Sequence, residues 1–252
     1  MTKKIILSHR GVCTKSICVE NTLSIMIDTY NLIKNNDNFT IGFEFDIQLT
    51  KDNKIICYHD NDMVRIHNKK TLIKEELYNF LEIYKVSLLS DILDYFRDKE
   101  VVLNIEIKVD DNIDNIDDDY IYRITETLYK LVDYPQDKIL ISSFSKRIIE
   151  HLLDNYRNTY TIVPIFDQNR YCLDFLKKLI NYGVNTIVLD KEILYENIKD
   201  IWGLNLTLFV YGILDINQDK LIQDKYIDNK IMKYNNINII TDRIDSIVLD
   251  II

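Results

Sequence analysis

The sequence predicts a single (β/α)8 TIM barrel, and three observations lead to this prediction. Short β-branched segments alternate with longer segments of helical periodicity along the whole chain, which is the pattern of repeated strand and helix units. The length of 252 residues matches the roughly 250 residues of a typical barrel. No linker, low-complexity segment or shift in composition divides the chain, so we expect residues 1–252 to form one domain.

These periodicities define nine strands and eight helices. The predicted strands are 4–8, 40–49, 54–58, 101–108, 138–142, 160–165, 186–189, 206–211 and 237–241. The predicted helices are 21–35, 88–97, 118–132, 146–155, 171–182, 191–201, 217–225 and 243–249. A composition that is 47% hydrophobic and 28% charged excludes intrinsic disorder, and five glycines and two prolines exclude collagen-like and proline-rich classes.

Nine strands are one more than a barrel needs, and the surplus has a local explanation. Residues 50–53 leave no room for a crossover helix between strands 40–49 and 54–58, so these two strands must form an antiparallel hairpin. The hairpin then counts as one barrel strand with a protruding arm. After it, residues 61–99 are expected to form a short and mostly helical insertion.

The hairpin also predicts that certain side chains converge. With the turn centred at residues 51 and 52, Glu44 faces His59 and Asp46 faces Cys57. Side chains alternate between the two faces of a strand with a period of two. We therefore expect Glu44, Asp46 and His59 to point to the same side of the ribbon.

Residues that can do chemistry lie at the predicted C-terminal ends of several strands. They are His9, Arg10, Glu44, Asp46, His59, Glu106 and Lys108. The C-terminal ends of barrel strands share one rim, where the catalytic residues of such folds lie. A single charged residue at a strand end is usually a surface or supporting residue. Glu106 and Lys108, however, lie on one face of an apolar strand, where burial without a partner or ligand is costly.

These residue types suit the cleavage of a phosphodiester. Three carboxylates supply hard oxygen ligands for Mg²⁺ or Ca²⁺ and leave positions for water and substrate oxygens. Arg10 can bind a phosphate through two hydrogen bonds, and Lys108 adds a second positive charge. Two histidines can divide proton transfer, one as base and one as acid. The set predicts metal-assisted phosphodiester chemistry with a divalent cation as cofactor.

Charge and composition argue against several partners and compartments. A net charge of −9 without a basic stripe argues against a nucleic-acid partner. No apolar run reaches the roughly 18 residues of a transmembrane segment, and the N-terminus lacks the apolar core of a signal peptide. The four cysteines favour free thiols in a reducing compartment, with a Cys13–Cys18 disulfide as the alternative in a secreted protein. We expect a soluble, cytoplasmic protein.

Seven short motifs in order along the chain carry a family resemblance. They are His9-Arg10-Gly11, Glu20-Asn21-Thr22, Glu44-x-Asp46-x-x-Leu49-Thr50-x-Asp52, His59-Asp60 followed by Arg65, Glu106-Ile107-Lys108, Ser143-Phe144 and Thr241-Asp242. This combination resembles the glycerophosphodiester phosphodiesterase family, part of the superfamily of barrel-shaped phosphodiesterases that includes phosphatidylinositol phospholipase C. The resemblance implies hydrolysis of glycerophosphodiesters to glycerol 3-phosphate and an alcohol.

The resemblance also implies a role for each residue of the set. The implied acid/base pair is His9 and His59, the implied metal ligands are Glu44, Asp46 and Glu106, and the implied phosphate contacts are Arg10 and Lys108. Glu20 would support the site, and Tyr211 stands where a substrate-side tryptophan is usual. In the family's usual mechanism a glycerol hydroxyl attacks phosphorus and water opens the cyclic phosphate. The residues alone do not distinguish this route from direct attack by water.

Departures from the family pattern concern the substrate more than the reaction. Val19 replaces a usual proline, and Ile66 and His67 replace a usual pair of threonines. The head group and acyl preference stay open, with a small glycerophosphodiester or a lysolipid as candidate substrate. Two alternatives also stay open. One is a phospholipase D-like enzyme of the sphingomyelinase D type acting on lysophospholipids or sphingolipids, and the other is a non-catalytic barrel that binds a phosphate ligand.

Overall fold

The computed structural model describes residues 3–13, 19–109, 117–212 and 237–249. Within them, eight parallel strands form a closed ring. In ring order they are β1 (Ile5–His9), β2 (Thr40–Leu49), β7 (Val102–Ile107), β8 (Ile139–Ser143), β9 (Thr161–Phe166), β10 (Thr186–Asp190), β11 (Thr207–Tyr211) and β12 (Ile237–Thr241). β1 pairs with both β12 and β2, which closes the sheet. The predicted (β/α)8 barrel is confirmed.

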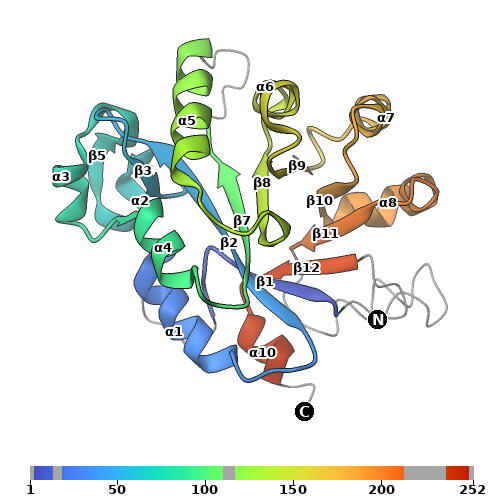
Figure 1. Cartoon of the computed structure of the whole chain (residues 1–252), viewed down its shortest axis with the longest axis horizontal. Helices are drawn as coiled ribbons and strands as arrows, with labels where there is room; N and C mark the ends of the chain where they lie inside the picture. The colour runs from blue at the N-terminus through green and yellow to red at the C-terminus, as the bar shows by residue number, and fades with distance from the viewer. Residues whose placement is uncertain (1–2, 14–18, 110–116, 213–236, 250–252) are drawn as a thin grey trace.

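Helices surround the strands (Figure 1). They are α1 (Leu23–Ile33), α4 (Leu89–Phe96), α5 (Asp118–Leu131), α6 (Lys146–Tyr156), α7 (Leu173–Asn181), α8 (Lys191–Trp202) and α10 (Ile244–Leu249). Their apolar faces bury the outward side chains of the strands. Phe96 of α4, for example, packs on Phe43 of β2 with ring centroids 4.9 Å apart. The predicted helix 217–225 lies outside the described residues.

The interior of the barrel changes character along its axis. An apolar cluster fills one part, formed by Leu7, Val102, Leu140, Val163, Ile165, Val188, Phe209 and Ile240. Because side chains alternate along a strand, Glu106 points to the same side of β7 as Val102 but lies nearer the C-terminal end. The same alternation places Glu44 and Asp46 on one face of β2. The strands therefore carry carboxylates from an apolar interior to the C-terminal rim.

The hairpin of β2 and β3 (Ile55–Cys57) differs from its predicted register by one residue. Cys57 pairs with Ile47, whereas the register predicted from the sequence pairs Cys57 with Asp46. The loop holds the three residues 51–53 and ends on Asn53 in the left-handed region, with φ 58°, so its centre lies at Asp52. As a result, strand alternation does not bring His59 to face Glu44, and the predicted pairing of these two residues is wrong. His59 lies beyond the end of β3.

The insertion between β3 and α4 is mixed rather than mostly helical. It contains β4 (Asp62–Met63), α2 (Val64–His67), β5 (Lys69–Leu72), the 3₁₀ turn η1 (Ile73–Glu75), α3 (Tyr78–Glu82) and β6 (Ser87–Leu88). β4 pairs with β5, and β6 pairs with β3. These strands are too short to show a period in the sequence. A separate apolar cluster around Met63, Ile73 and Leu81 packs the insertion against the hairpin.

Among the described residues, no helix combines the length and the apolar character that crossing a bilayer requires. Cys13 and Cys57 are buried free thiols, and Cys172 is an exposed one. Cys18, the second member of the alternative disulfide, lies outside the described residues.

Candidate active site

Three buried carboxylates converge at the C-terminal rim of the barrel. Glu44 and Asp46 come from β2 and Glu106 from β7, where it pairs with Asp46. The residues are only 3%, 1% and 6% exposed, respectively. One oxygen of each lies within 4.8 Å of the others. The structure thus brings together the three residues that the sequence proposes as metal ligands.

Burial and mutual repulsion disfavour the charged form of two of these carboxylates. Burial, together with repulsion from Asp46, raises the pKa of Glu44. Burial also raises the pKa of Glu106, since repulsion from Asp46 offsets part of the attraction of Lys108. Oε1 of Glu44 is buried and has no hydrogen-bond partner. Converging carboxylate oxygens with an unpaired buried oxygen are the donor set that a hard divalent cation binds.

Lys108 and Arg10 supply positive charge to the cluster from two sides. Nζ of Lys108 lies 2.5 Å from Oε1 of Glu106 and 3.3 Å from Oδ1 of Asp46. Nε of Arg10 lies 3.7 Å from Oδ2 of Asp46. Arg10 has φ 51°, and its backbone N–H donates to Oε2 of Glu44 at 3.1 Å. Burial opposes ionisation of Asp46, but the charges of Lys108, His59 and Arg10 outweigh it and lower the pKa of Asp46.

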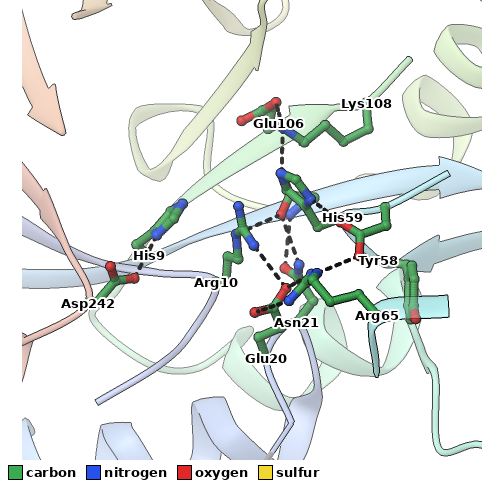
Figure 2. Close-up of polar contacts among 12 residues, drawn as sticks. His9, Arg10, Glu20, Asn21, Tyr58, His59, Arg65, Glu106, Lys108 and Asp242 are labelled. Atoms are coloured by element: carbon green, nitrogen blue, oxygen red, sulfur yellow. Dashed lines mark hydrogen bonds and ion pairs between the residues drawn. The ribbon is translucent and has the colours of Figure 1, made fainter. Parts of the chain in front are cut away.

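His9 is the last residue of β1 and has an acidic partner on each ring nitrogen. Nδ1 lies 2.7 Å from Oδ1 of Asp242, and Nε2 lies 3.8 Å from Oε2 of Glu44. Asp242 directly follows β12, the neighbour of β1, which is why residues at opposite ends of the chain meet (Figure 2). Burial lowers the pKa of His9, but the hydrogen bond to Asp242 and the charge of Glu44 outweigh it, so the pKa is raised.

His59 is held by side chains rather than by a strand. Nδ1 of its ring lies 2.6 Å from Oδ1 of Asp60. The side-chain amide of Gln48 donates to the carbonyls of Tyr58, His59 and Asp60, at 2.9, 3.3 and 2.8 Å. Gln48 is buried on β2 two residues after Asp46. One face of β2 therefore carries two carboxylates and the amide that fixes the segment of His59.

The pKa of His59 is shifted in the opposite direction to that of His9. Burial lowers the pKa of His59, and the positive charges of Lys108 and Arg10 add to this effect. Attraction from Asp46 and the hydrogen bond to Asp60 oppose it without reversing it. Each histidine thus has its own aspartate on Nδ1, Asp242 for His9 and Asp60 for His59. Their pKa values are nevertheless shifted in opposite directions.

Asn21 and Glu20 reach the site from the segment before α1. Nδ2 of Asn21 donates to Oδ2 of Asp46 at 2.8 Å, and its Oδ1 accepts from the backbone N–H of Asp46 at 3.1 Å. Glu20 accepts from Nη1 of Arg10 at 2.9 Å, so it supports the site through an arginine. The Glu-Asn-Thr motif signals Asn21 in the sequence, but its contact with Asp46 depends on the tertiary structure.

A pocket of about 530 Å³ opens beside the carboxylates. Its lining includes His59, Asp60, Arg65, Glu106, Lys108 and Phe144. Tyr211, which the sequence proposes as a substrate contact, is not among the lining residues. Its ring packs edge-on against Phe144, with centroids 6.4 Å apart. Tyr211 thus contacts a residue of the pocket wall, while His59 and Lys108 line the pocket themselves. His9, Arg10, Glu44 and Asp46 are likewise not among the lining residues.

Known proteins resemble this chain in sequence and in fold. The uncharacterized protein YqiK of Bacillus subtilis is 32% identical over 80 residues, which cover 27% of this chain and 33% of YqiK. A glycerophosphodiester phosphodiesterase from Thermotoga maritima has a TM-score of 0.70 at 20% identity, covering 97% of each chain. A phosphodiesterase from Oleispira antarctica, solved in complex with the product sn-glycerol-3-phosphate, has a TM-score of 0.74 at 15% identity, covering 99% of this chain and 97% of that one.

The family assignment follows from the sequence. The model of the glycerophosphoryl diester phosphodiesterase family matches residues 9–246, from the first histidine of the site to the helix after the last barrel strand. The chain therefore belongs to the glycerophosphoryl diester phosphodiesterase family, a family of phosphoric diester hydrolases.

Proposed function

We propose that this protein hydrolyses glycerophosphodiesters to glycerol 3-phosphate and an alcohol, with a divalent cation as cofactor. The observation that carries the proposal is the placement of two histidines, each with Nδ1 against an aspartate, beside a cluster of three buried carboxylates. Family membership supports the reaction class. The glycerol 3-phosphate complex of the Oleispira protein supports the substrate class.

Glu44, Asp46 and Glu106 are the residues that would hold the cation, Mg²⁺ or Ca²⁺. Their oxygens lie close together, and the unpaired Oε1 of Glu44 is available to bind it. The cation would supply charge neutralisation and polarise an oxygen of the phosphoryl group. The side chain of Asn21 binds both the backbone N–H and the carboxylate of Asp46. The Asp46 carboxylate is therefore oriented before a cation binds.

The histidines would move protons through their Nε2 atoms. A carboxylate on Nδ1 favours the tautomer that carries a proton there, which leaves Nε2 to accept or give a proton. The lowered pKa of His59 suits a base that is neutral near pH 7, and the raised pKa of His9 suits an acid. Lys108 and Arg10 would bind the non-reacting phosphate oxygens.

Product analysis tests the proposal. The protein is incubated with glycerophosphocholine, glycerophosphoethanolamine, glycerophosphoglycerol and a lysophospholipid, and products are followed by ³¹P NMR and an enzymatic assay for glycerol 3-phosphate. We expect glycerol 3-phosphate from at least one diester, loss of activity with a chelator and recovery with Mg²⁺ or Ca²⁺. A cyclic phosphate as the final product would instead support the phospholipase D-like alternative. Binding of these diesters without cleavage would support the non-catalytic barrel.

A further inference from the structure

Arg65 of the insertion binds two carboxylates that belong to different parts of the site. On α2, its Nε donates to Oδ2 of Asp60 at 2.6 Å. Its two terminal nitrogens donate to Glu20, Nη2 to Oε1 at 2.5 Å and Nη1 to Oε2 at 3.2 Å. Figure 2 shows the guanidinium of Arg65 between Glu20 and the segment of His59. Arg65 belongs to one of the motifs of the family resemblance, but the resemblance implies no role for it.

Each of these carboxylates also binds a residue of the proposed machinery. Asp60 uses its other oxygen, Oδ1, for Nδ1 of His59 at 2.6 Å. Glu20 accepts from Nη1 of Arg10 at 2.9 Å. Arg65 is thus one carboxylate away from the proposed base and one carboxylate away from a proposed phosphate contact.

We propose that Arg65 is a positioning residue that fixes the imidazole of His59 through Asp60 and the guanidinium of Arg10 through Glu20. A planar guanidinium has donors on three nitrogens and can bind two carboxylates at fixed angles, which a lysine cannot do. The catalytic consequence rests on the proposed function, whereas the orientation of His59 does not. The insertion would then contribute to catalysis as well as to the pocket wall.

The ion pairs of Arg65 are better suited to orienting side chains of the site than to stabilising the fold. The side chain of Arg65 is 48% exposed, and ion pairs at such exposure add little to stability. α2 has its own anchors, since Asp62 caps the N–H of Val64 at 2.8 Å and β4 pairs with β5. We therefore expect Arg65 variants to fold, so that a loss of activity reports on the site.

The chain offers a matched control. Arg97 is 50% exposed and also bridges two carboxylates, Asp133 at 2.8 Å and Asp94 at 3.1 Å. Asp94 lies on α4, Arg97 directly follows α4 and Asp133 follows α5, and none of the three lines the pocket. Arg97→Gln removes the same type of contact without touching the site. We expect its activity to equal that of the wild type.

A double-mutant cycle tests the coupling. We expect Arg65→Gln to lower kcat about 10- to 100-fold, by analogy with the loss of residues that orient metal ligands, with KM changed less than about threefold. In the Asp60→Asn background the link from Arg65 to His59 is already broken, so Arg65→Gln should lower kcat further only through Glu20. The fold-loss of kcat in the double variant should therefore fall clearly below the product of the two single fold-losses. Losses that multiply fully, with a raised KM, would overturn the proposal and indicate direct substrate contact.

A second measurement does not depend on activity. The chain has four histidines, so ¹⁵N imidazole NMR can follow each ring. We expect the nitrogen resonances of His59 to shift in Arg65→Gln, while those of His151, on α6, stay unchanged in both variants. Unchanged His59 resonances would overturn the positioning role. If the wild-type protein cleaves no diester, the proposed function is contradicted. The His59 resonances alone then decide whether Arg65 positions His59.

Discussion

The two proposed catalytic histidines are held by regions of different construction. His9 ends a strand that is paired on both sides, by β12 and β2, and its partner Asp242 directly follows β12. His59 lies beyond the end of a short strand, where the amide of Gln48 fixes its backbone and Asp60 fixes its ring. His9 is therefore fixed by the barrel itself, and His59 by a few side chains. Single substitutions should disturb the His59 side while the barrel stays intact.

Removal of either ring should have the largest effect on turnover. We expect His9→Ala and His59→Ala each to lower kcat by about 10²- to 10⁴-fold, the usual contribution of general acid or base catalysis. Circular dichroism and thermal unfolding should match the wild type, because neither ring belongs to the apolar core. Undiminished activity in one variant would refute the role of that histidine.

On the barrel side, Gly42 gives the sharpest structural test. A Cβ at this position would lie 2.0 Å from the carbonyl oxygen of Val102 on β7, so the backbone itself would have to move. We expect Gly42→Ala to lower the free energy of unfolding by about 3 kcal/mol or to prevent folding. Gly203→Ala is the control, since a Cβ there would lie 4.0 Å from its nearest neighbour, the carbonyl oxygen of Asp200. Equal unfolding midpoints in urea would contradict this packing.

On the hairpin side, Gln48→Leu should damage the site more than the fold. The substitution leaves three carbonyls around His59 without their shared donor, at a cost of about 1–3 kcal/mol in stability. We expect kcat to fall about tenfold, with imidazole resonances of His59 shifted more than those of His9. If both rings respond equally, the two sides are not held independently.

The smallest expected effect concerns pH. The pKa of His59 is lowered from 6.5 and that of His9 is raised from 6.5. A base must be neutral and an acid protonated, so the active form prevails between the two values. We expect a bell-shaped profile of kcat/KM whose acidic limb lies below pH 6.5 and whose alkaline limb lies above it. If His59→Ala removes the alkaline limb of the profile rather than the acidic limb, His59 is the acid and His9 the base.

The same contrast explains what the sequence predicts well. Each barrel strand ends within one residue of its expected position, and the strand 40–49 matches β2 at both ends. These strands are buried and regular, so hydrophobic periodicity reports them directly. The convergence of Glu44, Asp46 and Glu106 follows from strand alternation and the shared rim, and it was predictable for that reason.

The hairpin side was harder to predict because its contacts are not periodic. The register depends on whether the loop holds an even or an odd number of residues, which composition does not show. His59 reaches the pocket although its predicted pairing with Glu44 is wrong, because Gln48 holds the chain where it leaves the sheet. The contacts of Arg65 with Glu20 and of Asp242 with His9 join residues far apart in the chain. Neither spacing nor motif order contains that information.

The most direct test of the account is a crystal structure with Mn²⁺ and glycerol 3-phosphate. We predict an anomalous peak bound by carboxylate oxygens of Glu44, Asp46 and Glu106, with the phosphate beside it and within reach of Nε2 of both His9 and His59. A cation bound elsewhere, or a phosphate that contacts neither histidine, would contradict the proposed site.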